Sequence, residues 1–476
     1  MSLPSPMFFV TIINLGLMLF VVFSQRRNTA ATWAWLVACA LFPIGGFILY
    51  MLGGQDRLKQ RVFQLKTKED QELLAEYEAL LVGAVEGQLT HDNTIELFHD
   101  GVTKFDALLD DIKHAKKSIF AQYYILRGDE TGRRFMNALT ERAAEGIEVR
   151  LLIDGMGCHY TSANTWDPFL KAGGLLGVFL PPVPVRVNFR NHRKYVIVDG
   201  ELAYLGGSNI GDEYMGMTER HGHWRDTHMR YIGKAVAPVM LRFIMDWNCD
   251  ATKTPDKISL KHDYFPKPLT YADAVAHTEL VESTGIYEAP RLHNNAMIKL
   301  LSSGPDTRYP NVLHEFNDLI MHAKKSIYIQ SPYFVPDESM FICLRIAALR
   351  GVDVRIMYPG NPDHPFVYWV ASSFVGELLE AGVKGYEYTK GFIHCKTMMV
   401  DGKISAVGTA NMDVRSFKIN FETHAFIEDE SITQELIKEF YKDMEDCKEI
   451  HLTEYEQRSR MTKIKESVSR LFSPLL

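Results

Sequence analysis

Hydrophobic positions dominate the first 54 residues and then give way to a long region in which helical and strand-like patterns alternate. Residues 7–23 and 29–54 contain no charged side chain, and about 20 apolar residues are enough to cross a bilayer. We therefore expect a transmembrane helical hairpin in residues 1–54, with spans at about 7–23 and 31–52. One span or a re-entrant segment are the alternatives. A cleaved signal peptide is disfavoured, because no Lys or Arg precedes the first apolar segment and a second one follows at once.

The longer region contains two parts with the same order of elements. In each part a helix, a strand, a second helix and a second strand follow one another, as in FDALLDDIKHAKKSI, GRRFMNALTERAAEG and IEVRLLID. This alternation predicts an α/β fold with a mainly buried sheet. The expected divisions are a charged linker helix at 55–92, a first repeat at 93–252, an irregular connector at 253–295, a second repeat at 296–450 and an amphipathic tail at 451–476.

The tail places apolar side chains on one helical face and basic side chains on the other. The apolar positions are Ile464, Val468, Leu471 and Phe472. Such a helix can dock on the protein body or lie on a membrane surface, and the pattern favours neither interpretation over the other.

One motif of five fixed positions occurs in both parts. It has the form His-x-Lys-x4-Asp-x6-Gly-x2-Asn, and its residues are His192, Lys194, Asp199, Gly206 and Asn209, then His394, Lys396, Asp401, Gly408 and Asn411. HAKKSI also occurs twice, and GIEVRLLIDG is echoed by GVDVRIMYPG. A repeat of this length indicates two similar domains rather than a solenoid, whose units have roughly 20–50 residues.

Two copies of the motif supply paired catalytic groups if a pseudo-two-fold axis brings them together. With His192 facing His394, one imidazole can attack an electrophile while the other donates a proton to the leaving group. The lysine two residues after each histidine lies on the same strand face, and with the asparagines it can hold the oxygens of a phosphoryl group. The expected phosphate-binding residues are Lys194, Asn209, Lys396 and Asn411. The pattern indicates phosphodiester chemistry without a metal.

A metal site is the alternative interpretation of ERHGHWRDTH, which contains His221, His223, Asp226 and His228. Its spacing matches no standard zinc pattern and the second repeat has no counterpart, so we expect no metal there. A carboxylate that orients a catalytic histidine is favoured instead. The candidates are Asp226 and Glu219 in the first repeat and Glu422, within INFETH, in the second.

The doubled motif resembles the HKD signature of the phospholipase D superfamily, and the chain as a whole resembles bacterial cardiolipin synthases of the phospholipase D type. The shared phrases are NHRKYVIVDG, GGSNIGDEY, HWRDTH, YEYTKGFIHCK, NMDVRSFKINFE and RLFSPLL, together with the apolar N-terminal pair. The resemblance covers essentially the whole chain. It implies two phospholipase D-like α/β/α sandwich repeats related by pseudo-two-fold symmetry.

The resemblance further implies transfer of a phosphatidyl group between two phosphatidylglycerol molecules, giving cardiolipin and glycerol without a cofactor. A phosphohistidine intermediate is expected, in which one of His192 and His394 is the nucleophile and the other is the acid and base; relatives favour His192 as the nucleophile. Asp199 and Asp401 join the catalytic set by this resemblance, although a turn-stabilising role fits the Asp-Gly pairs equally well. The oligomeric state stays open.

Several other activities share the motif. A phospholipase D that uses water and a phosphatidyltransferase with another acceptor alcohol are close alternatives, because every acceptor enters at the same step. A membrane-tethered nuclease and a non-catalytic lipid-binding scaffold are more distant ones. The net charge of −7 argues against a nucleic-acid partner, and the intact His and Lys positions argue against a scaffold.

Charges beside the apolar segments predict the orientation of the protein. Arg26 and Arg27 separate the two segments, whereas more basic residues follow the second one, namely Arg57, Lys59, Arg61, Lys66 and Lys68. The positive-inside rule then predicts that the catalytic body lies in the cytoplasm. The resemblance implies that the protein is a multi-pass protein of the bacterial inner membrane. Six cysteines without a Cys-x-x-Cys pair agree with a reduced compartment.

Overall fold

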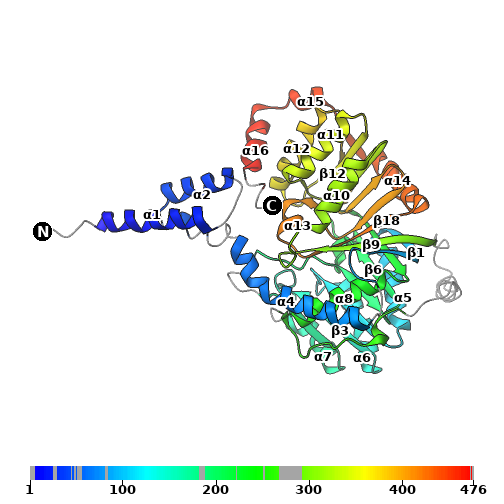
Figure 1. Ribbon diagram of the computed structural model, residues 1–476. Helices are drawn as coiled ribbons and strands as arrows, with labels where there is room; N and C mark the ends of the chain where they lie inside the picture. Colours follow the sequence, from blue (N-terminus) through cyan, green and yellow to red (C-terminus); the bar gives the residue numbers. More distant parts are fainter. Residues whose placement is uncertain are drawn as a thin grey trace.

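The computed structural model describes residues 6–24, 29–43, 45–47, 50, 56–80, 84–181, 188–220, 222–249, 252–266, 292–471 and 473. Several predicted features lie wholly or partly outside these ranges, among them residues 267–291 of the connector, the end of the second apolar span, His221 and Phe472. Within the described residues, most of the chain forms a two-part body, from which two N-terminal helices extend on one side (Figure 1).

The first repeat is a sheet between two layers of helices. Its elements are β1 (Leu89–Asp100), α5 (Gly101–His114), β2 (Ser118–Tyr123), α6 (Glu130–Ala144), β3 (Glu148–Asp154), α7 (Asp167–Lys171), β4 (Leu175–Phe179), β5 (Tyr195–Val198), β6 (Leu202–Gly206), β7 (His223–Ile232), α8 (Val236–Asn248) and β8 (Thr252–Lys253). Strands β2, β3 and β4 are parallel, and β5, β6, β7 and β1 extend the sheet in antiparallel fashion. Val196 and Val198 pack with α5 and α6, whereas Tyr195 and Ile197 pack with α8. Because side chains alternate along β5, both faces of the sheet are covered.

The second repeat has the same order of elements. They are β9 (His293–Ser303), α10 (Asn311–His322), β10 (Ser326–Gln330), β11 (Phe334–Val335), α11 (Glu338–Leu349), β12 (Asp353–Pro359), α12 (Pro365–Leu379), β13 (Lys384–Tyr388), β14 (Gly391–Ile393), β15 (Thr397–Val400), β16 (Ile404–Gly408), β17 (Met412–Asp413), α13 (Val414–Lys418), β18 (Glu422–Glu428), α14 (Glu430–Glu445) and β19 (Cys447–Ile450), followed by α15 (Leu452–Glu456) and α16 (Arg460–Arg470). Strands β10, β12 and β13 are parallel, and β15, β16, β18 and β9 continue the sheet. Met398 and Val400 pack with α10 to α12, and Met399 packs with α14. The prediction of a duplicated α/β fold is confirmed.

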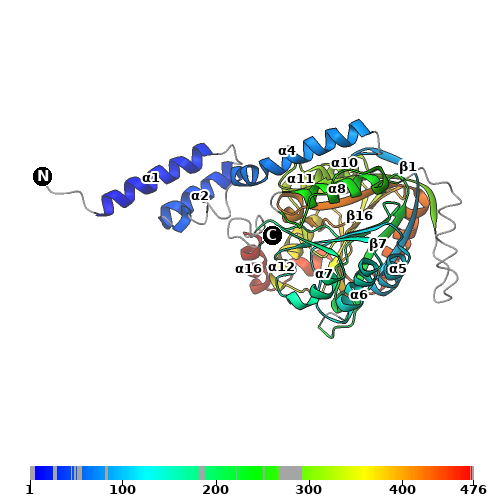
Figure 2. The ribbon, with the colours of Figure 1, turned by 90° about the horizontal axis from the view of Figure 1, so that it is seen from below.

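Strand pairing joins the two repeats. Strands β1 and β9 are antiparallel neighbours, with Ile95 opposite His293, and both begin a few residues before the predicted repeat boundaries at 93 and 296. Strand β7 of the first repeat pairs in parallel with β14 of the second, with Trp224 opposite Phe392. The strands of both repeats therefore meet in the middle of the body, with helices on either side (Figure 2).

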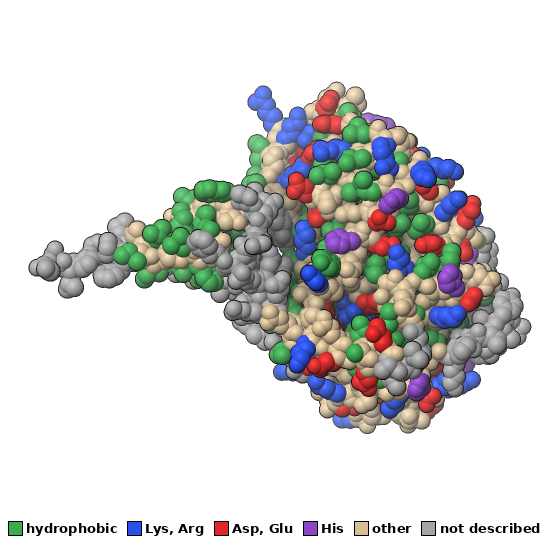
Figure 3. All heavy atoms as spheres, in the orientation of Figure 1, with side chains coloured by type: hydrophobic (Ala, Val, Ile, Leu, Met, Phe, Trp, Pro, Cys, Tyr) green, Lys and Arg blue, Asp and Glu red, His purple; other side chains and the backbone are tan. Residues whose placement is uncertain are grey.

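Two apolar helices precede the body, α1 (Pro6–Ser24) and α2 (Thr29–Leu41). They project from it and present mainly hydrophobic side chains to the outside (Figure 3). Leu15 is 58% exposed and Trp33 64%. Among the residues that the structure describes, no helix has the length and hydropathy needed to cross a membrane, so the predicted transmembrane hairpin is not confirmed.

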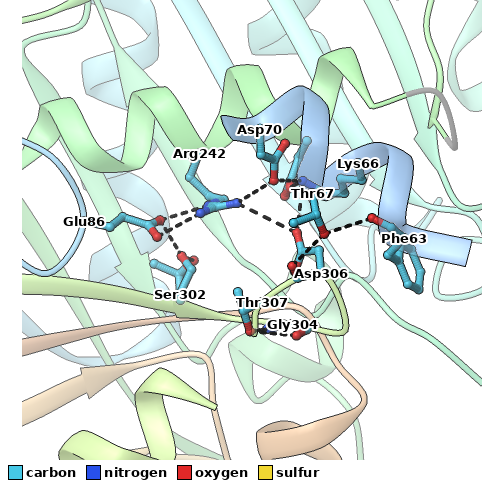
Figure 4. Close-up of polar contacts among 12 residues, drawn as sticks. Phe63, Lys66, Thr67, Asp70, Glu86, Arg242, Ser302, Gly304, Asp306 and Thr307 are labelled. Carbon is cyan, nitrogen blue, oxygen red and sulfur yellow. Dashed lines mark hydrogen bonds and ion pairs between the residues drawn. The ribbon is translucent and has the colours of Figure 1, made fainter. Parts of the chain in front are cut away.

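The predicted linker helix, α4 (Asp56–Leu80), is bound to the body by a buried cluster of charges (Figure 4). The Nζ atom of Lys66 lies 2.7 Å from Asp70, 3.1 Å from Asp306 and 3.3 Å from Asp246. Burial disfavours the charge of this lysine, but the three carboxylates outweigh that effect and raise its pKa. Arg242 adds a second cation, 3.3 Å from Asp70. The cluster joins α4 to both repeats, because Asp246 belongs to the first repeat and Asp306 to the second.

Loss of the Lys66 ammonium would leave buried carboxylates without this partner. We expect Lys66→Ala to lower the free energy of unfolding by about 3–5 kcal/mol, measured by chemical denaturation of the full chain. The matched control is Lys68→Ala on the same helix, because this lysine is 74% exposed and pairs with Glu72 at 3.5 Å in solvent. Its effect should stay below about 1 kcal/mol. If both substitutions lowered the free energy of unfolding by the same amount, α4 would not be packed into the body through Lys66.

Candidate active site

The two motif histidines line one cavity between the repeats. His192 comes shortly before β5 and His394 shortly before β15, so they hold equivalent positions. Both line a cavity of about 480 Å³, together with Asn209 and Asn411. The fold thus brings together four of the predicted site residues, two from each repeat.

Each histidine is held by a carboxylate of the other repeat. Nδ1 of His192 lies 2.9 Å from Oε1 of Glu422, a residue of the second repeat. Nδ1 of His394 lies 2.8 Å from Oδ2 of Asp226, a residue of the first. Both carboxylates are buried, at 0% and 2% exposed. Each repeat therefore supplies the carboxylate that orients the histidine of the other repeat, and the sequence pattern did not indicate this exchange.

Backbone hydrogen bonds link the two repeats in the same reciprocal way. The N–H of His192 donates to the carbonyl oxygen of Phe421 at 2.9 Å, and the N–H of His394 donates to the carbonyl oxygen of Arg225 at 2.7 Å. Each acceptor residue directly precedes the carboxylate that binds the same histidine. Backbone pairing therefore sets the position of each carboxylate relative to its histidine.

Burial in the cavity wall makes both imidazoles hard to protonate. Loss of solvation lowers the pKa of His192 and that of His394 to about 4, although the neighbouring carboxylate acts in the opposite direction in each case. A neutral imidazole that donates from Nδ1 to a carboxylate keeps a lone pair on Nε2, which can attack or accept a proton. A bound phosphate anion would favour the protonated form that a general acid requires.

The motif lysines lie beneath the histidines rather than at the cavity surface. Nζ of Lys194 donates to the carbonyl oxygen of His192 at 2.6 Å, and Nζ of Lys396 donates to that of His394 at 2.7 Å. Both lysines are buried, at 0% and 1% exposed. Burial lowers the pKa of both groups, that of Lys396 to about 8. They support the histidine backbone and add positive charge behind the cavity wall.

The two asparagines reach the cavity with different neighbours. Asn209 accepts a hydrogen bond from the N–H of Ile125 at 3.1 Å and donates to the Tyr214 hydroxyl at 3.2 Å. Nδ2 of Asn411 donates to Asp413 at 3.0 Å, and its Oδ1 is buried without a hydrogen-bond partner among the described residues. An amide nitrogen carries two hydrogens, so each side chain can also donate to an oxygen atom in the cavity.

The motif aspartates lie at the far ends of their strands. Asp199 accepts hydrogen bonds from three consecutive N–H groups, those of residues 116 to 118, at 2.6 to 3.1 Å. Asp401 does the same with residues 324 to 326, at 2.7 to 3.1 Å. Both have left-handed backbone conformations, with φ of 55° and 54°. This geometry supports the turn-stabilising alternative, and the sequence HAKKSI recurs because it supplies these N–H groups.

The described residues of the alternative metal cluster do not converge on one point. His223 and Asp226 lie on opposite faces of β7, and His223 is 3.0 Å from the Tyr388 hydroxyl. Within the described ranges, which omit His221, no three such side chains could hold one ion. Glu219, the other candidate carboxylate, is exposed on a turn.

The motif glycines make room for a second pair of histidines. A Cβ atom on Gly206 would lie 2.4 Å from Nδ1 of His228, and one on Gly408 would lie 2.6 Å from Nδ1 of His424. Both histidines are buried, and neither ring has a hydrogen-bond partner in the described part of the chain. These glycines are therefore needed for close packing beneath the site.

Four arginines that the motif did not reveal also line the cavity: Arg127, Arg190, Arg220 and Arg415. Burial and the charge of Arg190 lower the pKa of Arg415. Neighbouring cations in a cavity wall fit an anionic ligand. Their closeness to the motif, in NFRNHRK and NMDVRSFK, is the signal that could have identified Arg190 and Arg415.

The fold and the site define a class of protein. The structure of phosphatidylserine synthase from Haemophilus influenzae matches 80% of this chain and 95% of its own with a TM-score of 0.61; at 16% identity this likeness concerns the fold alone. The family described as cardiolipin synthase, PLD-like domain, matches residues 108–220 and 316–444, one match in each repeat. A phospholipase D-nuclease N-terminal family matches residues 12–55. The protein is a duplicated member of the phospholipase D class.

Full-length relatives narrow this class to one family. A cardiolipin synthase from Listeria welshimeri is 42% identical over 497 residues, which cover 98% of both chains. A cardiolipin synthase from Staphylococcus aureus is 40% identical over 494 residues, which cover 98% of this chain and 95% of the relative. The chain belongs to the cardiolipin synthase family.

Glu422 is hydrogen-bonded to the His192 imidazole, and its charge can be removed with little change in shape. We expect Glu422→Gln to lower kcat by roughly 10²–10⁴-fold, because an amide holds the imidazole less firmly and does not stabilise the positive charge that the ring acquires when it attacks phosphorus. The acid limb of the pH–rate profile should move to lower pH, since the Glu422 charge raises the pKa of His192. Glu422→Asp should restore part of the rate. Glu428→Gln, at the other end of β18, is the control and should leave the acid limb in place. An acid limb that does not move in Glu422→Gln would contradict the role of Glu422 in holding His192.

His424 should make the protein less stable in acid. Burial, with the charge of Lys396, lowers its pKa to about 3, against about 6.5 in an unfolded chain. Above pH 6.5 neither state binds the proton, but as the pH falls toward 3 the unfolded chain binds it and the folded chain does not. His424→Leu should therefore reduce the loss of unfolding free energy between pH 7 and pH 4 by about 2–3 kcal/mol. The exposed His159→Leu should leave that loss unchanged, and a similar result for both would rule the explanation out.

Proposed function

We propose that this protein transfers a phosphatidyl group from one phosphatidylglycerol molecule to another, giving cardiolipin and glycerol. The observation that carries the proposal is the reciprocal pairing of His192 with Glu422 and of His394 with Asp226 around one cavity. Two oriented imidazoles at one site provide nucleophilic attack and proton transfer in the same step. Family membership supplies the substrate class.

In the first half-reaction, Nε2 of His192 attacks the phosphorus of phosphatidylglycerol. A nitrogen–phosphorus bond forms and the bond from phosphorus to the glycerol oxygen breaks. The imidazolium of His394 gives its proton to that oxygen, so glycerol leaves as a neutral alcohol. The role of His192 as the attacking group is assigned from the family resemblance.

In the second half-reaction, the now neutral His394 takes a proton from a hydroxyl group of a second phosphatidylglycerol. The freed oxygen attacks the phosphorus and the nitrogen–phosphorus bond breaks, which gives cardiolipin and returns both histidines to their starting states. One phosphodiester replaces another, so the exchange needs no nucleotide. Lys194 and Lys396 behind the histidines and the cavity arginines stabilise the charge that develops on the phosphoryl oxygens.

The N-terminal helices hold the protein in the bacterial inner membrane as a hairpin, with the body in the cytoplasm. The match of residues 12–55 to a phospholipase D-type N-terminal family supports this placement. The exposed apolar side chains of α1 and α2 support it as well. A membrane location gives the cavity access to a substrate that is confined to the bilayer.

The products formed from phosphatidylglycerol alone test the proposal. Purified full-length protein in detergent should release cardiolipin and glycerol in equal amounts. Phosphatidic acid as the main product would replace the transferase with a hydrolase, since water would then be the acceptor. Absence of turnover would overturn the enzymatic assignment.

Variants of the two histidines separate their roles in the same assay. His192→Ala should form no covalent phosphatidyl-protein, because the attacking nitrogen is gone. His394→Ala should slow glycerol release by roughly 10²–10⁴-fold, and a substrate with a nitrophenol leaving group should restore the first half-reaction. The phosphatidyl group should then stay on residue 192, as mapped by peptide mass. Label on residue 394 in His192→Ala would reverse the two roles.

A further inference from the structure

The C-terminal helix α16 is attached to the body by its polar face. Glu466 is 2% exposed and accepts hydrogen bonds from Oγ of Ser372 on α12 at 3.2 Å and from Nε of Arg458 at 2.7 Å. Arg470 donates to Oγ of Ser373 at 3.2 Å and pairs with Glu377 at 2.7 Å, both on α12. Polar contacts thus hold α16 on α12, whereas an amphipathic helix ordinarily buries its apolar side.

The opposite face of α16 carries a line of exposed apolar side chains. They stand three, four and three positions apart and are 61%, 55%, 49% and 77% exposed, in the order Met461, Ile464, Val468 and Leu471. This spacing places them on one side of the helix. Scattered exposed apolar residues need no explanation, but four in line along a helix of 11 residues form a surface.

Basic side chains border this apolar line, namely Arg460, Lys463 and Lys465. The Nζ atom of Lys465 lies 4.7 Å from the centre of the Trp369 ring on α12. A helix with an apolar face and basic flanks is suited to the headgroup region of an anionic bilayer. A second copy of the chain fits less well, because like charges would face each other and a stable protein interface needs roughly 20–30 residues a side.

The position of α16 relates this surface to the rest of the protein. In both ribbon views α16 lies on the side of the body from which α1 and α2 extend (Figures 1 and 2). Helix α12, on which α16 packs, begins at the cavity, since His364 and Val367 belong to the cavity lining. The exposed apolar line is therefore connected through one helix to the active site.

We propose that α16 docks the catalytic body on the surface of an anionic phospholipid bilayer. Met461, Ile464, Val468 and Leu471 enter the boundary between headgroups and acyl chains, and the basic flanks bind the headgroups. Helix α12 is then held at the lipid surface, which places the opening of the cavity where the substrate lies. The proposal deepens the proposed function and rests on it, because a lipid substrate is what makes this placement useful.

Photo-crosslinking of the full chain tests the docking directly. A photoreactive benzoylphenylalanine replaces either Ile464 or Leu349, which is 70% exposed at the end of α11, in vesicles of phosphatidylglycerol. Irradiation should attach lipid at position 464 and not at position 349. Absence of lipid at 464, equal labelling at both positions, or a protein adduct at 464 would each overturn the proposal.

Turnover measurements test whether docking through α16 supports activity on a bilayer. The double variant Ile464→Gln/Val468→Gln should lose several-fold in turnover on phosphatidylglycerol vesicles and keep full turnover on the same lipid dispersed in detergent. Leu349→Gln should be unchanged in both. Equal loss in both assays would show that these side chains are structural and overturn the docking role. If the unaltered protein makes no cardiolipin in detergent, the proposed function fails, while lipid labelling at 464 still reports on docking.

Discussion

The pairs His192–Glu422 and His394–Asp226 join the two repeats, and neither repeat contains both members of either pair. A repeat on its own would hold a histidine without an orienting group and a carboxylate without a partner. Removing one member of a buried pair is strongly destabilising, so the assembly of the repeats and the arrangement of the catalytic groups depend on the same contacts. Backbone pairing beside each carboxylate makes the exchange rigid. Each histidine is therefore oriented only when both repeats are assembled.

A second set of buried charges extends the rigidity to the outer helix α4. Arg193 lies between the motif residues His192 and Lys194 and is fully buried. Its guanidinium pairs with Asp246 and donates to the carbonyl oxygen of Glu422 at 3.3 Å. Lys66 of α4 approaches the same Asp246, at 3.3 Å. Helix α4 is thus linked through Asp246 to Arg193, which directly follows His192, so this helix belongs to the body as well as leading to it.

Much of the site could be predicted from the sequence, because the duplication places the same short motif in the chain twice. The doubled motif was sufficient to identify both histidines and both asparagines of the cavity. It could not show the exchange of carboxylates, since His192 and Glu422 are 230 residues apart and meet only in the folded chain. The distance of Asp199 from the cavity could have been predicted from the sequence. Asp199 is five steps of roughly 3.3 Å along an extended strand from Lys194, which gives about 16 Å. The apolar face of the tail was visible in the sequence, but its outward direction depends on the polar contacts of Glu466 and Arg470.

The groups that perform the chemistry do not choose the acceptor, since water and an alcohol would both lose a proton to the same imidazole. Selection must therefore arise from the cavity wall. Tyr124 packs edge-on against His192, with ring centres 5.1 Å apart, and Trp224 lies 5.2 Å from His394. These aromatic rings take up space beside both imidazoles, and Arg190 and Arg415 add cations to the wall of the same cavity. In the proposed reaction, cations in this wall favour an anionic phospholipid over water as the acceptor, which is the condition for transfer to dominate over hydrolysis.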